Sequence, residues 1–324
     1  MAILKFLVQR LFYAAAMMLA VLAVNFALIH AAPGDPAMVI AGEMGGADEE
    51  ILDAIRKSYG LDKPVFTQFT TYMGRALQGD LGQSYLYSQP VIDLIGDRVG
   101  PTLLLVVTAL VIAILLGTAL GVFASRRPDS FASGAVTVFA LVGYAMPVFW
   151  TGILLVILFG KVIPIMPIAG MTDPRIYGGW WVTSIDVAHH LVLPALTLAL
   201  IYLALYSRLS RASMLEVLGS DYIRTARAKG LSENSVTYKH ALRNALMPIV
   251  TMAGVQFGNL LSGAVLVETV FSWPGLGTLA LDSILGRDYP TLMGVLTFGA
   301  ALTIIANQVT DFTYRLIDPR LRTR

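Results

Sequence analysis

A polar, basic segment at residues 216–248 carries most of the side chains that could bind a partner, and it lies between two long apolar runs. Ser220 or Asp221 can cap a short helix there, and basic residues such as Arg227 suit its last turn. Gly230 can end the helix in the left-handed conformation. About nine helical residues reach only roughly 14 Å, too short to cross a bilayer. The spacing therefore predicts a short surface helix that contacts a partner.

Catalytic and metal-binding patterns are missing from the sequence. A phosphate-binding loop needs Gly, four residues, then Gly-Lys-Ser/Thr, but Val162 follows Gly160-Lys161 and Leu155 replaces the first glycine. The chain has no cysteine, and its serines have no His or carboxylate at a recognisable catalytic spacing. The histidines have no metal-ligand spacing; they are His30, His189, His190 and His240. We therefore predict a chain that is no enzyme and binds no metal, cofactor or nucleotide itself.

Several polar side chains fall within or beside apolar runs, where they are costly and often functional. Gln256 and Asn259 would either line a translocation pathway or join helices by hydrogen bonds, and the sequence leaves both open. Glu268, at the outer end of the same run, is a further pathway candidate. His189-His190 precedes another apolar run, where interfacial polar residues are the favoured interpretation and a transient metal or substrate contact is the alternative.

Small residues four positions apart indicate places where helices pack closely. Gly117 and Gly121 form such a pair, and Gly254, Gly258 and Ser262 form a triple. Without large side chains between them, two helix backbones can approach within the membrane. We predict helix packing at both sites.

The composition indicates a membrane protein that holds these residues on long helices. Of the 324 residues 56% are hydrophobic and 14% are charged, against about 25% charged in a soluble domain. A span needs roughly 20 mostly apolar residues. Pro147 and Pro194 would kink the third and fourth spans. The six predicted spans are Leu11–Ala31, Thr102–Ser125, Phe131–Phe159, Leu191–Leu209, Ala245–Val267 and Leu292–Tyr314.

The distribution of basic residues predicts the orientation of these spans. An even number of spans puts both termini, residues 125–130 and residues 209–244 on one side of the membrane. That side receives most of the 23 Lys and Arg residues and few of the 21 Asp and Glu residues. Because basic loops stay in the cytoplasm, we predict that both termini and the basic segment are cytoplasmic.

Residues 32–98, between the first two spans, are too many for a turn and would form an external insertion. Asp48-Glu49-Glu50 opens a helical pattern there, Arg56-Lys57 closes it and Gly60 stops it. Acids first and bases last match the helix dipole. We predict a small folded cap; a disordered insert is the alternative, but the apolar periodicity argues against it.

Two stretches of the basic segment resemble a known motif. They read Tyr222-Ile223-Arg224-Thr225-Ala226-Arg227-Ala228-Lys229-Gly230 and His240-Ala241-Leu242-Arg243-Asn244-Ala245-Leu246-Met247-Pro248. Together they resemble the cytoplasmic coupling loop of ABC importer permeases of the dipeptide/oligopeptide/nickel branch. The general motif has Glu-Ala-Ala where this chain has Arg224-Thr225-Ala226, and this departure is similar to that branch. Further segments resemble it in order: Pro33-Gly34-Asp35-Pro36, Gly143-Tyr144-Ala145-Met146-Pro147 and Trp273-Pro274-Gly275-Leu276-Gly277.

The resemblance implies an all-α integral membrane fold of the type I ABC importer permease kind. Residues 1–324 would form one transmembrane permease domain with six helices, an extracytoplasmic insertion at 32–98 and a cytoplasmic coupling loop at 216–248. The residues implied in ATPase coupling are Asp221, Tyr222, Arg224, Thr225, Ala226, Arg227, Ala228, Lys229, Gly230, Leu231, His240, Arg243 and Asn244.

The same resemblance implies a multi-pass protein of the bacterial inner membrane that works with other subunits. A second homologous permease, two ATPase subunits that bind ATP and Mg, and an extracytoplasmic solute-binding protein would complete the importer in the lipid bilayer. No nucleic acid is expected as a partner. Dipeptides and oligopeptides are the implied substrates, with nickel chelates or glutathione-like solutes as the alternative. A secondary transporter driven by an ion gradient would predict paired intramembrane carboxylates and repeated halves, and the sequence contains neither pattern.

Overall fold

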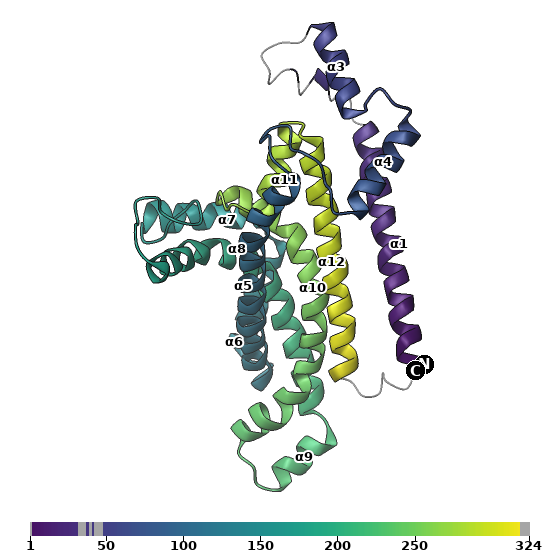
Figure 1. Cartoon of the computed structure of the whole chain (residues 1–324). Helices are drawn as coiled ribbons and strands as arrows, with labels where there is room; N and C mark the ends of the chain where they lie inside the picture. Colours follow the sequence, from purple (N-terminus) through teal and green to yellow (C-terminus); the bar gives the residue numbers. More distant parts are fainter. Residues whose placement is uncertain (1, 32–36, 39–40, 42–47, 318–324) are drawn as a thin grey trace. The chain divides into compact units, whose positions relative to one another are not determined.

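The computed structural model describes residues 2–31, 37–38, 41 and 48–317, and within them all regular structure is helical (Figure 1). The one exception there is an isolated bridge between Gln83 and Pro90. The chain divides into two compact units, which are described separately below. Unit 1 comprises Met1–Pro101 and Pro274–Gln308, and unit 2 comprises Thr102–Trp273 and Val309–Arg324. The predicted motif at residues 33–36 lies outside the described residues.

Unit 1 is built from helices that come from both ends of the chain. They are α1 (Ala2–Ala31), α3 (Glu49–Tyr59), α4 (Val65–Leu77), the start of α5 (Val91–Arg126), α11 (Leu276–Leu285) and most of α12 (Tyr289–Ile317). Val91 and Ile95 of α5 pack with Leu276, Leu279 and Val295 in one buried apolar cluster. That cluster joins sequence positions almost two hundred residues apart, which is why no local pattern predicts it.

The predicted helix in the insertion is confirmed as α3. Glu49 and Glu50 occupy its first turn, Arg56 and Lys57 its last, and Gly60 follows with φ of 69°. The second insertion helix, α4, was not predicted. Because α5 already begins at residue 91, the last eight residues of the predicted insertion 32–98 are helical turns that continue into the second span.

A buried carboxylate fixes the loop that leads into α5. Asp288, between α11 and α12, accepts hydrogen bonds from the Ser84 hydroxyl (2.5 Å), the Tyr85 backbone N–H (3.1 Å) and the Thr291 hydroxyl (2.6 Å). A buried charge is tolerated only when hydrogen bonds of this kind compensate for its lost hydration. These bonds hold the loop and the α11–α12 connection together within unit 1.

Unit 2 holds the remaining helices around the largest apolar core. They are the rest of α5, α6 (Phe131–Ala145), α7 (Val148–Val156), the π-helix η1 (Ile157–Val162), α8 (Trp180–Leu218), α9 (Asp221–Ala228), the π-helix η2 (Ser235–Ala241) and α10 (Leu242–Val270). Leu105 of α5, Leu198 and Tyr206 of α8, and Leu260 and Phe271 at and after α10 are among the buried core residues. These side chains pack α5, α8 and α10 against one another.

Four helices are long and apolar enough to cross a membrane, and two bent helix pairs bring the count to six if each pair is one span. The four, found among the described residues, are Val8–Leu28, Val91–Arg126, Trp180–Leu218 and Tyr289–Thr310, which confirms the first, second, fourth and sixth predicted spans. One pair joins Ser235–Leu261 to Ala264–Val270 and contains the fifth predicted span.

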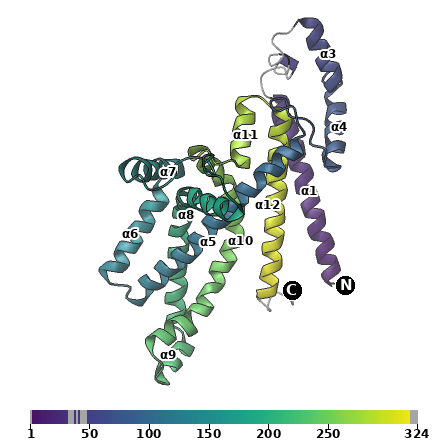
Figure 2. The ribbon, with the colours of Figure 1, turned by 60° about the vertical axis from the view of Figure 1, so that its left-hand side comes forward.

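The third predicted span, Phe131–Phe159, is wrong as a single kinked helix. α6 ends at Ala145, Met146 is extended (φ −82°, ψ 133°), and the following segment Val148–Val162 leaves at 104° to α6. A proline disfavours the helical conformation of the residue before it, so Pro147 accounts for the position of the break. Figures 1 and 2 show α7 turning away from α6. Pro194, by contrast, lies buried inside the uninterrupted helix α8.

Candidate functional site

Helix α9 is a short amphipathic helix whose apolar side is built into unit 2. Ile223 and Ala226 are buried in a cluster with Val122 of α5, Met214 of α8 and Val236 of η2. The other residues of α9 are exposed. Eight residues give a helix about 12 Å long, so α9 cannot cross a membrane. Its packing fixes one side and leaves a polar side for contact with another molecule.

The start of α9 differs in detail from the prediction. Ser220 occupies the N-cap position with extended backbone, but its side chain makes no cap bond. Its hydroxyl donates instead to the Val217 carbonyl at 2.6 Å. Asp221 is the first helical residue and pairs with Arg224 at 3.2 Å. The acidic residue therefore favours the helix N-terminus by its charge, without a side-chain cap.

The end of α9 confirms the predicted conformation of Gly230. Its φ is +77°, and its N–H donates to the Arg227 carbonyl at 2.9 Å. The next N–H, of Leu231, reaches back to the Ala226 carbonyl at 3.4 Å. A Cβ atom at Gly230 would meet none of the described atoms within 4 Å, so conformation and not space favours glycine here.

The loop after α9 is held by charged and polar side chains at both ends. Arg227 donates to both carboxylate oxygens of Glu233, at 2.9 and 3.3 Å. Arg126, the last residue of α5, donates to the Asn234 side-chain oxygen at 2.8 Å and lies over the Tyr238 ring at 5.9 Å from its centroid. These contacts tie residues 231–234 to α9 on one side and to α5 on the other.

Tyr222 joins the two halves of the basic segment. Its hydroxyl accepts a hydrogen bond from the Asn244 side-chain amide at 2.7 Å and donates to the His240 carbonyl at 3.4 Å. Three residues that the sequence placed in one motif thus meet in space. The π-helix η2 between them was not predicted, because π-turns have no simple sequence signal. Arg243 and Lys229 are exposed beside this junction.

The pathway candidates differ sharply in exposure. Asn259 is exposed at the middle of α10 and donates to the Gln256 side-chain oxygen at 2.9 Å. Gln256 is half-buried and contacts the Met252 sulfur at 3.6 Å. Glu268 is fully buried and accepts a hydrogen bond from the Thr102 hydroxyl at 2.6 Å. The amide pair therefore lies on an open helix side, whereas Glu268 bonds within the core of unit 2.

The small residues predicted to pack helices lie at close helix contacts where the structure describes them. A Cβ at Gly117 would lie 2.7 Å from the Tyr206 Cβ, and one at Gly121 would lie 2.5 Å from the Ser207 carbonyl oxygen. Both contacts bring α5 against α8. Gly254 faces Thr310 in the same way. Gly258 is buried on α10, and the side chain of Ser262 lies outside the described residues.

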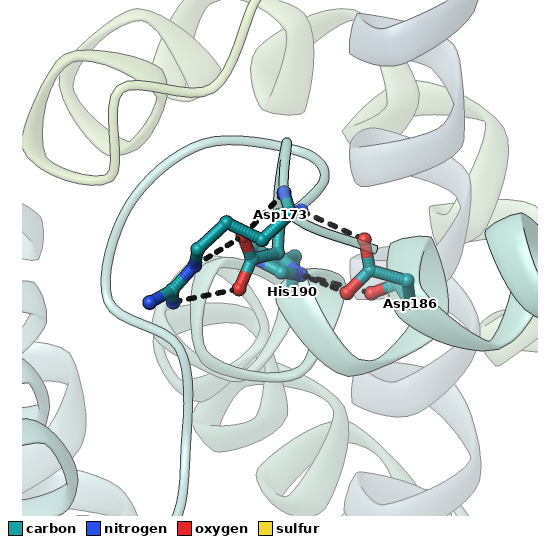
Figure 3. Close-up of polar contacts among 4 residues, drawn as sticks. Asp173, Asp186 and His190 are labelled. Atoms are coloured by element: carbon teal, nitrogen blue, oxygen red, sulfur yellow. Dashed lines mark hydrogen bonds and ion pairs between the residues drawn. The ribbon is translucent and has the colours of Figure 1, made fainter. Parts of the chain in front are cut away.

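The histidine pair at the start of the fourth span belongs to a polar latch, which we define as Asp173, Arg175, Asp186 and His190 (Figure 3). The buried Asp186 carboxylate accepts from the Asp173 N–H at 2.8 Å and lies 3.1 Å from His190 Nδ1. His190 Nδ1 also lies 2.9 Å from the Asp186 carbonyl oxygen. Since both neighbours are acceptors, Nδ1 carries the proton.

The outer half of the polar latch is an exposed ion pair. Arg175 donates to both carboxylate oxygens of Asp173, at 3.0 and 2.8 Å, and lowers the pKa of that carboxyl to about 2. The latch thus ties the loop before α8 to the first turns of that helix. No group of three or more potential ligands that could hold a metal ion occurs in the described part of the chain.

Comparison with family models matches almost the whole chain. Residues 113–323 match the model described as binding-protein-dependent transport system inner membrane component, and residues 3–106 match the model of its N-terminal part. The breadth of these matches covers both units and the segment that contains α9.

Similar curated proteins extend over nearly the full length. A putative peptide permease protein of Brucella ovis is 39% identical over 320 residues, which cover 98% of this chain and 99% of that protein. The dipeptide transport system permease protein DppB of Escherichia coli K12 is 38% identical over 336 residues, with the same coverage. The glutathione transport system permease protein GsiC of Escherichia coli O6:H1 is 40% identical over 297 residues, 92% of each chain.

Two solved transporters share the fold at low sequence identity. The inward-facing MetNI methionine ABC transporter gives a TM-score of 0.56 at 17% identity, covering 70% of this chain and 97% of that one. An amino acid ABC transporter crystallised with histidines gives 0.51 at 16% identity, covering 69% and 94%. About seven tenths of this chain therefore has the architecture of these transport proteins.

Proposed function

The chain belongs to the family of binding-protein-dependent transport system inner membrane components, and from this premise we propose that it forms half of the translocation pathway of an ATP-driven peptide importer. Its fold is that of type I ABC importer permeases, and a protein of this family is a transport permease and not an enzyme. Relatives named as peptide and dipeptide permeases, 38–39% identical over 98% of the chain, support peptides as the substrate.

The observation that carries the proposal is the construction of α9. Ile223 and Ala226 are buried against α5 and α8, while Arg224 and Arg227 stay exposed on the other side. A force applied to this exposed side would pass through packed side chains to helices that span the membrane. The α9 residues, the Gly230 end and the Tyr222 junction would therefore receive the movement of an ATPase subunit.

ATP hydrolysis belongs to separate subunits in this proposal. Two ATPase subunits would bind ATP and Mg and contact the exposed side of α9 in the cytoplasm, which places both chain termini on that side. ATP would shift the complex between inward-facing and outward-facing states because the ATPases bind it differently in the two. An extracytoplasmic solute-binding protein would deliver peptide from the side of the insertion 32–98.

A second, homologous permease chain would supply the other half of the pathway. The exposed pair Gln256 and Asn259 at mid-helix supports a location facing the pathway or the partner permease, because lipid would leave these amides without hydrogen-bond partners. Glu268 stays a pathway prediction whose burial and bond to Thr102 favour a role in holding the helix end.

A glutathione-like substrate is the second candidate. The glutathione permease relative is 40% identical over 92% of this chain, close to the values for the peptide permeases. Glutathione is itself a modified tripeptide, so one pathway could suit both classes. Nickel chelates remain an alternative that rests on the sequence motif alone.

Transport in reconstituted vesicles tests the proposal. The chain would be co-purified with its partner subunits, and uptake of a labelled dipeptide, glutathione and a nickel chelate would be measured with the binding protein outside. We expect peptide uptake that requires ATP in the compartment facing α9 and stops with a non-hydrolysable analogue. Uptake driven by an ion gradient without ATP would contradict the proposal and indicate a secondary transporter.

A further inference from the structure

A second group of basic side chains lies away from α9, where α5, α6 and α8 meet within unit 2. Arg208 and Arg211 stand one turn apart on α8, and Arg127 lies in the short turn between α5 and α6. Figure 2 shows the sharp turn from α5 into α6. The only acidic residue of that turn is the exposed Asp129, so the group keeps a net positive charge.

The arginines of this group are poorly satisfied by the described part of the chain. Arg211 makes one long hydrogen bond, from Nη2 to the Pro128 carbonyl at 3.4 Å, and its buried Nε has no acceptor there. Arg208 is exposed and lies over the Tyr144 ring, with its guanidinium carbon 5.1 Å from the centroid. Neither arginine has an ion-pair partner among the described residues. A guanidinium held in this way favours binding of an anion with several acceptor oxygens.

The start of α6 adds to the attraction for an anion. Arg211 contacts Pro128, three residues before the first residue of this helix, which is 15 residues long. The Ser130 hydroxyl accepts from the Ser133 N–H at 3.2 Å, so one of the first N–H groups is satisfied. The others leave the partial positive charge that helix N-termini offer to phosphate groups.

The surroundings of these arginines are strongly apolar and exposed. Phe131, at the start of α6, is 93% exposed, and Phe123 near the end of α5 is 57% exposed. A soluble anion gains nothing from such neighbours, whereas a lipid brings acyl chains that cover them. Basic residues at the ends of spans also attract anionic headgroups in the cytoplasmic leaflet.

We propose that Arg208 and Arg211, beside the N-terminus of α6, bind the phosphate of an anionic phospholipid whose acyl chains lie on Phe123 and Phe131. The site is separate from α9 and independent of the substrate. Its place in the cytoplasmic leaflet rests on the orientation proposed above, but the binding itself does not. A bound lipid would join α8 to the α5–α6 turn through its headgroup.

Native mass spectrometry of the full-length chain, purified with its partner permease, tests the site. The complex would be titrated with phosphatidylglycerol and with zwitterionic phosphatidylcholine. We expect tighter binding of phosphatidylglycerol, reduced at least about tenfold in the double variant Arg208→Gln/Arg211→Gln, because charge-assisted bonds to phosphate are lost. Arg75→Gln removes one exposed charge from α4 and serves as the matched control, with unchanged binding.

Each outcome decides for or against the lipid site. Equal phosphatidylglycerol affinity in the double variant and the native chain would overturn it, as would an equal loss in Arg75→Gln, which would indicate non-specific charge attraction. Displacement of the lipid by millimolar inorganic phosphate would show a phosphate site instead. If the double variant fails to elute as a single species, the exposed Arg208→Gln alone must still weaken binding severalfold. Loss of peptide uptake with lipid binding intact would count against the proposed function only.

Discussion

Replacement of Gly230 separates backbone conformation from space at the end of α9. With φ at +77° and no described atom within 4 Å of a Cβ added at this position, alanine would fit sterically but would have to adopt the left-handed region. That conformation costs an L-residue about 1–2 kcal/mol, so a cost near 1.4 kcal/mol shifts the local equilibrium roughly tenfold. Asparagine tolerates it better and a β-branched valine worse.

The expected order of damage is therefore Gly230→Asn, then Gly230→Ala, then Gly230→Val. Hydrogen exchange of the backbone amides at 221–231 should quicken in that order, by roughly tenfold for alanine. ATP-dependent uptake in vesicles should fall in the same order, at equal protein abundance, because the helix end would be misplaced against the ATPase.

A neighbouring glycine provides the matched control. Gly219 ends α8 with φ of −82°, and a Cβ added there would make only ordinary contacts of 3.5 Å or more. Gly219→Ala should leave both exchange and uptake nearly unchanged. If Gly230→Ala and Gly230→Val behave like Gly219→Ala, the left-handed end of α9 has no part in coupling, and the reasoning is refuted.

Three further predictions concern topology, packing and the polar latch. A cysteine at the exposed Gln78 should react with an impermeant reagent in intact cells, and one at the exposed Ser232 only after permeabilisation; labelling of both in intact cells would contradict the orientation. Gly121→Ala should destabilise the chain by about 1–3 kcal/mol in thermal unfolding, since its Cβ would press on α8 backbone at 2.5 Å, whereas Gly134→Ala, with no described neighbour within 4 Å, should not. Asp186→Ala should lower stability by about 2 kcal/mol because it leaves buried hydrogen-bonding groups without their acceptor, and an unchanged unfolding midpoint would show that the latch is dispensable.

The sequence predicted the spans well where hydropathy and helix length agree. It located the third apolar run correctly but missed its 104° break, because a hydropathy window averages over Met146 and Pro147. The comparison with Pro194 shows why residue type was insufficient. Pro194 is buried within α8, where packing on both sides holds the helix together, whereas Pro147 is exposed and lacks that support.

The candidate site was predictable in composition but not in its connections. The alternation of buried Ile223 and Ala226 with exposed basic residues follows from helical periodicity, and Gly230 ends the helix as expected. The bond of Tyr222 with Asn244, twenty-two residues away, depends on how α9 folds back on α10, which no local pattern contains. For Glu268 the polar side chain was visible in the sequence, but its bond to Thr102 depends on long-range packing.

The π-helix η2 sets the rotational phase between α9 and α10. Its bonds close over five residues, as from the Leu242 N–H to the Thr237 carbonyl, so it holds a residue that an α-helix of the same length would exclude. Deleting one residue within 235–241 would let the segment close as an α-helix and turn everything after it by about 100°. Ala245 and Ile249, now buried, would swing out of the core. This junction therefore works as a key of fixed length: chain length here is as strictly constrained as residue identity, and homologous permeases can be exchanged across it only with the spacing preserved.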